Sequence, residues 1–519
     1  MEILTKQLEM NQLGRTIVNQ FLVDEDYNVP DSKSDVRKVI LTEGVLKIEE
    51  QKPMDNYLRL IGNITFQVLY ETESMSTRFS CLEGKLPFDE MIYIEEGAND
   101  YFTIKNSSVD LKVTMIHSRK LRVKALVELA VQAEMRKCEE IPIDVIDEKN
   151  IHKKQENLEL LRLHTSKRDT YRIKEEIILP GTKESLGMIL WSDISNRKLD
   201  TRLAAGELQF TGELQVFCFY ESPDEKMDWV EQSVPYSGKI ECYGIDETMY
   251  HHVKAELEDV RSEIRVDEDG EFRLVGIEGT LKLSIAVYEE EEIQVLRDLY
   301  SLEGKCLLET SEAVYEQLIL QNHSKCKVME RLSVPELKNQ VLQICHSKGR
   351  VLVEQMEPQV DGVLVSGVLY VNFLYVKSND DTPFDVWQGM VPFSHLVECG
   401  YVGEGLRFDI ATMLEQLHVT LQGGNEIEVK AALAFHGFFR KEEQIRKINK
   451  IHLEPFSKEE LEKRPSIVGY IAKEGDDIWS LAKRYYTSEK SIREMNELGD
   501  KELRAGDRLL IFKENVGIL

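Results

Sequence analysis

The fold of this chain is limited most strongly by a segment that occurs three times. In each copy a glycine precedes a tyrosine by eight residues, and the pairs are Gly62 and Tyr70, Gly212 and Tyr220, and Gly367 and Tyr375. The residues between glycine and tyrosine alternate between apolar and polar in the first copy, which is typical of a half-buried β-strand. Repetition of this kind indicates that one β-rich unit occurs three times along the chain.

Further landmarks recur at fixed distances from each glycine. A proline lies 32 residues before it, a Pro-aromatic pair lies 23 to 25 residues after it, and a second apolar strand begins about 60 residues after it. The prolines are Pro30, Pro180 and Pro335, and the pairs are Pro87-Phe88, Pro235-Tyr236 and Pro392-Phe393. Several short strands separated by turns predict a β-sandwich or an open barrel for each unit. Because the three tyrosines occupy the same place in their strands, we expect them to pack in the core.

The predicted fold class is mainly β, with three tandem repeats, short helical connectors and a small βααβ module at the end. The helical connectors are expected where apolar residues have helical spacing, at 4–21, 157–163 and 311–320. The expected domains are repeats at 1–150, 151–305 and 306–448, a linker at 449–465 that is partly helical, and the terminal module at 466–519.

Composition excludes several classes of partner. The formal net charge of −28 repels the phosphate backbone, so we expect no nucleic-acid partner. No apolar stretch approaches the roughly 20 residues that span a bilayer, so we expect no membrane insertion. The N-terminal residues contain no basic region followed by an apolar run, so we expect no secretory signal and a cytosolic location.

The sequence offers no catalytic or metal-binding motif. It contains no phosphate-binding glycine loop, no Gly-x-Ser-x-Gly elbow and no His-Glu-x-x-His, so we expect no enzymatic activity, no catalytic residues and no cofactor. His323 and Cys326 could in principle meet Cys345 and His346 around zinc, but their spacing is poor. Surface histidines with buried cysteines are the simpler interpretation, and we expect no metal site.

The terminal module has the pattern of two helices between two strands. Gly475 permits a turn and Asp476 is expected to cap the first helix, while Ser488 is expected to cap the second. Trp479 follows the buried position 478 and falls off the apolar face, so we expect it to be exposed and to contact a partner. The alternative is that Trp479 lies over the linker or over Tyr486.

The terminal module resembles a LysM domain over its whole length. The resemblance rests on Gly475-Asp476-Asp477-Ile478-Trp479-Ser480-Leu481-Ala482, on Asn496 and on Leu503 to Leu509. Asp477 stands where threonine is usual and Ala505 where proline is usual. The three repeats resemble the SPOCS domain, with a hallmark at Asp24-Glu-Asp-Tyr-Asn-Val-Pro-Asp-Ser-Lys-Ser-Asp35 in which Ser34 replaces a common proline. SPOCS repeats followed by one LysM domain resemble the SipL-type family of clostridial spore coat morphogenetic proteins.

This resemblance implies a scaffold of the mother-cell cytoplasm at the forespore surface. Its LysM domain is expected to bind the coat ATPase that polymerises around the forespore, together with other coat proteins, and so to promote encasement. The expected contact residues are Trp479, Ile467 and Lys483. The alternative is binding of a GlcNAc polymer of the spore cortex or cell wall in a groove that comprises Gly475, Asp476, Asp477, Ile478, Asn496 and Leu498.

Overall fold

Each of the three repeats folds into six antiparallel strands. The first repeat comprises β1 (Glu2–Asn28), β2 (Val36–Met54), β3 (Tyr57–Thr72), β4 (Phe79–Tyr93), β5 (Tyr101–His117) and β6 (Lys120–Ile146). The second comprises β7 (Ile151–Ile178), β8 (Met188–Ala204), β9 (Glu207–Glu221), β10 (Met227–Glu241), β11 (Tyr250–Arg265) and β12 (Leu274–Ser301). The third comprises β13 (Gly304–Ser333), the short 3₁₀ helix η1 (Pro335–Leu337), β14 (Val341–Gln359), β15 (Gly362–Lys377), β16 (Phe384–Glu398), β17 (Leu406–Gly423) and β18 (Glu426–Pro455).

The six strands of a repeat form two three-stranded sheets that pack face to face. In the first repeat the strand orders are β1-β6-β5 and β2-β3-β4, and the other two repeats follow the same plan. A separate apolar core fills the space between the two sheets of each repeat. The computed structural model describes residues 1–74, 78–94, 101–146, 151–337, 341–378, 383–423, 425–457, 459–460 and 463–513. The predicted mainly β fold class is confirmed.

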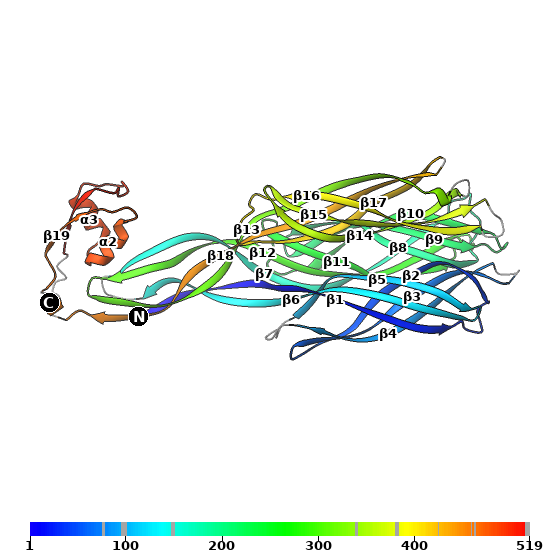
Figure 1. Ribbon diagram of the computed structural model, residues 1–519, viewed down its shortest axis with the longest axis horizontal. Coiled ribbons are helices and arrows are strands. Elements are labelled where there is room, and N and C mark those ends of the chain that lie inside the picture. Colours follow the sequence, from blue (N-terminus) through cyan, green and yellow to red (C-terminus); the bar gives the residue numbers. More distant parts are fainter. Residues whose placement is uncertain are drawn as a thin grey trace.

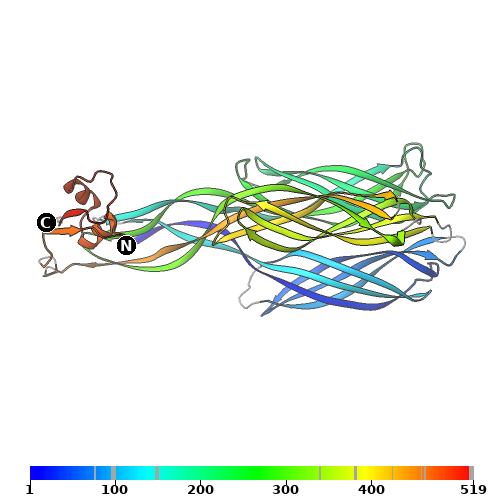
Figure 2. The ribbon, with the colours of Figure 1, turned by 45° about the horizontal axis from the view of Figure 1, so that its top comes forward.

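The molecule is elongated (Figures 1 and 2). The three sandwiches lie side by side at one end and form a broad body. Long strands leave this body as a narrow stalk, and the terminal module with its two helices sits at the far end of the stalk, where both chain termini also lie. Within the described residues no helix is long and apolar enough to cross a membrane.

The repeated glycine and the repeated aromatic residue are cross-strand neighbours. Gly62 lies opposite Phe88, Gly212 opposite Tyr236 and Gly367 opposite Phe393. A Cβ atom added at Gly212 would lie 2.2 Å from the ring of Tyr236, so no side chain fits there. An aromatic ring that covers a strand glycine stabilises the pair. The constant distance between the two motifs is therefore set by the length of one hairpin.

The repeated tyrosines pack in the core, as predicted. Tyr70, Tyr220 and Tyr375 are all at most 5% exposed. The Tyr70 hydroxyl donates to the carbonyl of Ser34 at 3.0 Å, and the Tyr220 hydroxyl donates to the carbonyl of Glu184 at 3.2 Å. In the first two repeats the tyrosine thus anchors the segment that follows the repeated proline.

The prediction of helical connectors is wrong. Residues 4–21, 157–163 and 311–320 lie within the long strands β1, β7 and β13. In β7 the two faces exchange at a β-bulge, where Tyr288 pairs with Leu163 and Val287 pairs with Thr165. A bulge inserts one residue and breaks the strict alternation of a strand, so the apolar spacing resembles that of a helix. The expected linker is also shorter than predicted, because β18 continues to Pro455, and residues 458, 461 and 462 lie outside the described part.

Three two-stranded ribbons form the stalk. They are the parts of the long strands that extend beyond their third neighbour, namely 2–13 with 134–146, 151–162 with 289–301, and 304–316 with 442–455. All six strands contribute to one buried core, which contains Leu8, Met10, Ile141, Leu158, Leu160, Ile293, Val295, Ala313, Tyr315 and Ile445. No ribbon could bury these side chains alone, so the stalk needs all three repeats.

The repeats also meet at the centre of the body. The rings of Phe79, Phe219 and Phe384, one from each repeat, contact one another with centroid distances of 6.1, 5.6 and 4.9 Å. They belong to a core that includes residues of all three repeats. The body is therefore one packed unit rather than three loosely linked domains.

A buried polar cluster joins the same three repeats. Asp193 of the second repeat accepts hydrogen bonds from His346 at 2.9 Å and from Lys348 at 2.8 Å, both in the third. Lys348 also reaches Glu43 of the first repeat. Burial opposes the charge on His346, but its hydrogen bonds to Asp193 and Glu231 outweigh this effect and raise its pKa. The expectation of a surface histidine is wrong for His346, which is 6% exposed.

Candidate functional site

The terminal module consists of β19 (Ile467–Ile471), α2 (Ile478–Tyr485), α3 (Glu489–Met495) and β20 (Arg508–Phe512), which confirms the βααβ order. Its small core contains Ile478, Leu481, Ala482, Ile492, Leu509 and Ile511. The helices are amphipathic, so one side of each faces this core and the other is free for contacts.

Two side chains cap the helices, and one of them differs from the prediction. Ser488 caps α3 as expected, since its hydroxyl accepts from the amide of Ser491 at 3.1 Å. The cap of α2 is Asp477 rather than Asp476, with its carboxylate 2.6 Å from the amide of Ser480. Asp476 instead accepts from the Lys473 amide and fixes the turn before the helix. Two adjacent aspartates compete for the same role, and the sequence does not distinguish them.

The prediction that Trp479 is exposed is wrong. Trp479 is 8% exposed and packs against Tyr300 of the stalk, with ring centroids 4.9 Å apart and nearly perpendicular planes. Its indole nitrogen donates to the carboxylate of Asp298 at 2.8 Å. The alternative position over Tyr486 is also not found, because Tyr486 packs on Phe456. The tryptophan lies off the apolar face of its own helix because it belongs to the apolar core of the docked interface.

Further contacts dock the module on the stalk. Lys483 binds the same carboxylate of Asp298 as Trp479 does. The hydroxyl of Tyr300 donates to the carbonyl of Thr487 at 2.8 Å, and this contact is buried. The other face of the Tyr300 ring stacks on His152 with centroids 4.9 Å apart. Two strands of one ribbon thus present a prepared surface to the module.

The start of α2 also faces the stalk. The ammonium of Lys154 lies 3.6 Å from the carboxylate of Asp477. Burial favours the neutral form of Asp477, but hydrogen bonds from Ser480 and the attraction of Lys154 outweigh it, so the pKa of this carboxyl lies below its ordinary value. Asp477 is therefore charged at neutral pH and adds an ion pair to the docked interface.

Ile467 lies on a different surface from Trp479 and Lys483. It is 55% exposed and shares the outward face of the β19–β20 sheet with Ile471 and Leu510, which are 62% and 51% exposed. We call these three residues the outward apolar face. The predicted contact residues therefore do not form one surface in the docked protein.

The six predicted groove residues have mixed placements. Gly475 adopts a positive φ of 86° and lies in open space, whereas Ile478 is buried in the module core. Leu498 packs partly against the same core. Asn496 holds β20, because its side-chain amide donates to the carbonyl of Leu510 at 2.8 Å and its oxygen accepts from the Leu510 amide at 2.7 Å. Asn496, Asp476 and Asp477 thus have structural hydrogen bonds already.

Sequence reasoning missed the stalk side of the interface. Asp298, Tyr300 and His152 carry the dock, but they belong to long strands that contain no motif at these positions. Their partners are more than 180 residues away in sequence. The described residues contain no group of three or more histidine, cysteine or acidic side chains that could hold a metal ion.

Family models match four parts of the chain. The model described as "SipL, SPOCS domain" matches residues 35–119, 186–265 and 340–422, and the model described as "LysM domain" matches residues 470–512. No curated protein and no solved structure matches the chain. The SPOCS matches cover β2–β5, β8–β11 and β14–β17 and leave out the long strands that build the stalk. SPOCS and LysM domains are of the binding rather than the catalytic type and fit a protein of sporulation. The chain is therefore identified as a SipL-type protein, built from three SPOCS domains and one C-terminal LysM domain.

Proposed function

We propose that this protein is a non-enzymatic scaffold of spore coat assembly. In this proposal the LysM domain binds the coat ATPase that polymerises on the forespore, other coat proteins are further partners, and the complex promotes encasement of the forespore. The site of action is the mother-cell cytoplasm at the forespore surface.

The observation that carries the proposal is the outward apolar face of the LysM domain. Ile467, Ile471 and Leu510 lie together on it and are each more than half exposed. Exposed apolar groups that gather on one surface are typical of protein contacts. The domain sits at the far end of the stalk, away from the body (Figure 2), so a large partner can approach it.

Trp479 and Lys483 have a second role in this proposal. Both are engaged with Asp298 while the domain is docked. We therefore assign the first contact with the ATPase to Ile467. Trp479 and Lys483 become available to the partner only when the domain leaves the stalk.

A pull-down from sporulating cells with the full-length protein tests the proposal. We expect the wild type to retain the coat ATPase and Ile467→Arg to lose it, because a charge replaces an apolar contact group. Ile178→Arg is the matched control, since Ile178 is an equally exposed isoleucine on β7 of the body. Thermal unfolding of both variants should match that of the wild type.

The alternative function gives a different result in the same material. A protein that binds GlcNAc polymer through the groove at Gly475, Asp476 and Asp477 would retain chitin oligomers and recover no ATPase. Equal recovery of the ATPase by Ile467→Arg and by the wild type would contradict the role of the outward apolar face.

A further inference from the structure

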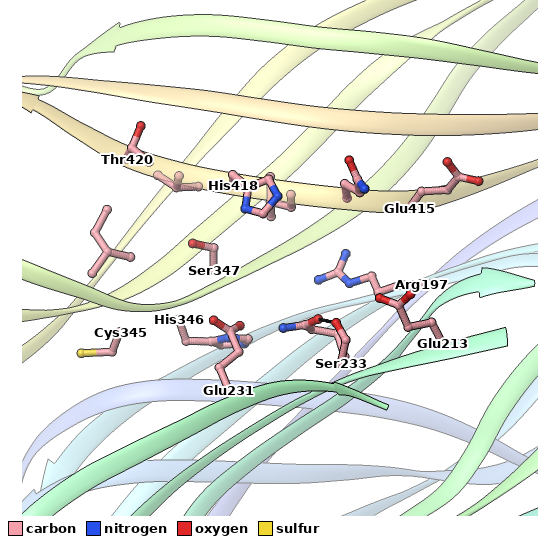
Figure 3. A pocket seen from close by; sticks show the side chains of 15 residues that line it. Arg197, Glu213, Glu231, Ser233, Cys345, His346, Ser347, Glu415, His418 and Thr420 are labelled. Atoms are coloured by element: carbon pink, nitrogen blue, oxygen red, sulfur yellow. Dashed lines mark hydrogen bonds and ion pairs between the residues drawn. The ribbon is translucent and has the colours of Figure 1, made fainter. Parts of the chain in front are cut away.

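A cleft of about 310 Å³ lies between the second and third repeats, far from the LysM domain. Strands β9 and β10 form one wall, and β14 and β17 form the other. Figure 3 shows the guanidinium of Arg197, which comes from β8, pointing into the space between the walls. A cleft of this size matches the lower range of small-molecule sites.

Arg197 has no partner among the residues that the structure describes. It is 6% exposed, yet none of the described carboxylates lies within 4.0 Å of its guanidinium, and none of the described groups accepts a hydrogen bond from it. Burial lowers its pKa, and the more distant Asp193 and Glu231 only partly offset this effect. Guanidinium groups that are buried to this extent are normally paired.

The acidic residues of the cleft are already engaged with other bases. Glu213 pairs with Lys198 at 2.8 Å, Glu415 pairs with Lys325 at 2.7 Å, and Glu231 pairs with His346 at 2.9 Å. The unmatched group of the cleft is therefore the guanidinium, which offers five N–H donors and accepts nothing.

The backbone directs Arg197 into the cleft. Arg197 is the additional residue of a β-bulge, because Asn196 pairs with Leu214 while Lys198 pairs with Glu213. Bulges change the direction of a side chain and occur next to functional sites.

The other two repeats provide an internal comparison. Their bulges near the repeated glycine hold Glu49 and Glu354, and they fall on the opposite side of that glycine. Glu49 is satisfied by the amide of Asn63 at 2.7 Å. The second repeat thus differs from its copies both in where the bulge lies and in the charge that the bulge carries.

We infer that the cleft binds a small molecule through a single carboxylate group, with Arg197 as its anchor. A guanidinium receives a carboxylate through two parallel N–H donors, a geometry that matches its planar fork. The neighbouring acids favour a singly charged group over a phosphate dianion, because each added negative charge is repelled by Glu213, Glu231 and Glu415. Ser347 and Thr420 supply hydroxyl groups on the facing wall for the rest of the ligand.

Acetate is the simplest probe of this site. We expect saturable binding of acetate to the full-length protein, followed by nuclear magnetic resonance of labelled acetate at constant ionic strength. The dissociation constant should be on the order of 1 mM for so small a ligand. Arg197→Gln should weaken binding about 10- to 100-fold, because it removes a charged hydrogen-bond donor. Arg202→Gln is the matched control, since Arg202 lies on the same strand with its side chain 76% exposed.

The thermal midpoint of the free protein is a second readout. If Arg197 is held for a ligand, Arg197→Gln should leave the midpoint unchanged or raise it, because the substitution removes an unpartnered buried charge. A lower midpoint would show a structural role and overturn the inference. Absence of saturable acetate binding, or equal binding by Arg197→Gln, would overturn it as well. Neither result bears on the LysM domain.

Discussion

At the scale of single residues, Gly212 is enclosed more tightly than any side chain allows. An added Cβ would meet the Tyr236 ring at 2.2 Å, in the core of the second repeat. We expect Gly212→Ala to lower the free energy of unfolding by about 1–3 kcal/mol, because overpacking forces neighbouring groups to move. Denaturant unfolding measures the change.

Gly181 provides the control for this prediction. It belongs to the same repeat, and a Cβ at this position meets nothing within 4 Å. Gly181→Ala should therefore change stability little. Equal stability of both variants would show that the ring of Tyr236 moves aside freely.

His346 makes the body sensitive to pH. Its pKa is raised in the folded protein by Asp193 and Glu231, with Lys348 and Glu43 in the same cluster. A raised histidine pKa stabilises the fold fully below the unfolded value of about 6.5, and the contribution is lost as pH rises through the folded value. The difference in unfolding free energy between wild type and His346→Gln should be larger at pH 6 than at pH 9. A difference that grows with pH would contradict the assignment.

Residues differ in how far the sequence could predict them. Ser488 caps its helix and Tyr70 packs in the core as predicted, because both roles depend on near neighbours or on the repeat itself. Trp479 could not be placed, because its partners Asp298 and Tyr300 are distant in sequence. An aromatic residue off an apolar helix face indicates a contact, but not whether the contact lies within the chain.

At the scale of elements, the stalk strands depend on their shared core. Tyr315 of β13 is fully buried there, and its hydroxyl has no partner among the described residues. Burial raises the pKa of Tyr315 to about 12. We expect Tyr315→Ala to cost about 3–5 kcal/mol of unfolding free energy, because it leaves a cavity.

Tyr315→Phe should have the opposite sign. It keeps the ring and removes a buried hydroxyl that lacks a hydrogen bond, so stability should rise by about 1 kcal/mol. Thermal or denaturant unfolding of both variants measures the two effects. A loss of stability in Tyr315→Phe would indicate that the hydroxyl has a partner.

The strands of the body were predictable and those of the stalk were not. Gly62 and Phe88 recur because they face each other across a hairpin, so repetition reveals them. The stalk segments read as helices because apolar residues such as Leu160 and Leu161 are both buried at successive positions. A strand shows that pattern only where a second ribbon covers its other face, and this depends on tertiary structure.

At the scale of the whole molecule, one carboxylate controls the position of the LysM domain. Asp298 receives both the indole of Trp479 and the ammonium of Lys483. Asp298→Ala should release the domain, and tryptic cleavage after Arg464 in the connecting segment should become faster. Arg464 is protected in the docked state by Phe456 and Tyr486, whose rings it covers at 3.6 and 4.1 Å.

Asp224→Ala is the control, because Asp224 is an exposed aspartate of the body. Unchanged cleavage in Asp298→Ala would show that packing of Tyr300 alone holds the domain. If Trp479 also contacts the coat ATPase, Asp298→Ala should strengthen recovery of that partner while leaving the folded LysM domain intact.

The stalk has a consequence for how the protein is made. Its first strand begins at Glu2 and its last strand ends at Pro455, so the first ribbon leaves the ribosome long before its neighbours exist. At about 5–20 residues per second, synthesis of the missing strands takes tens of seconds. During that time apolar residues such as Leu8 and Ile141 are without their final neighbours, and the nascent chain is open to aggregation. Stalk closure is therefore the last folding step, and it reports that all three SPOCS domains have been synthesised.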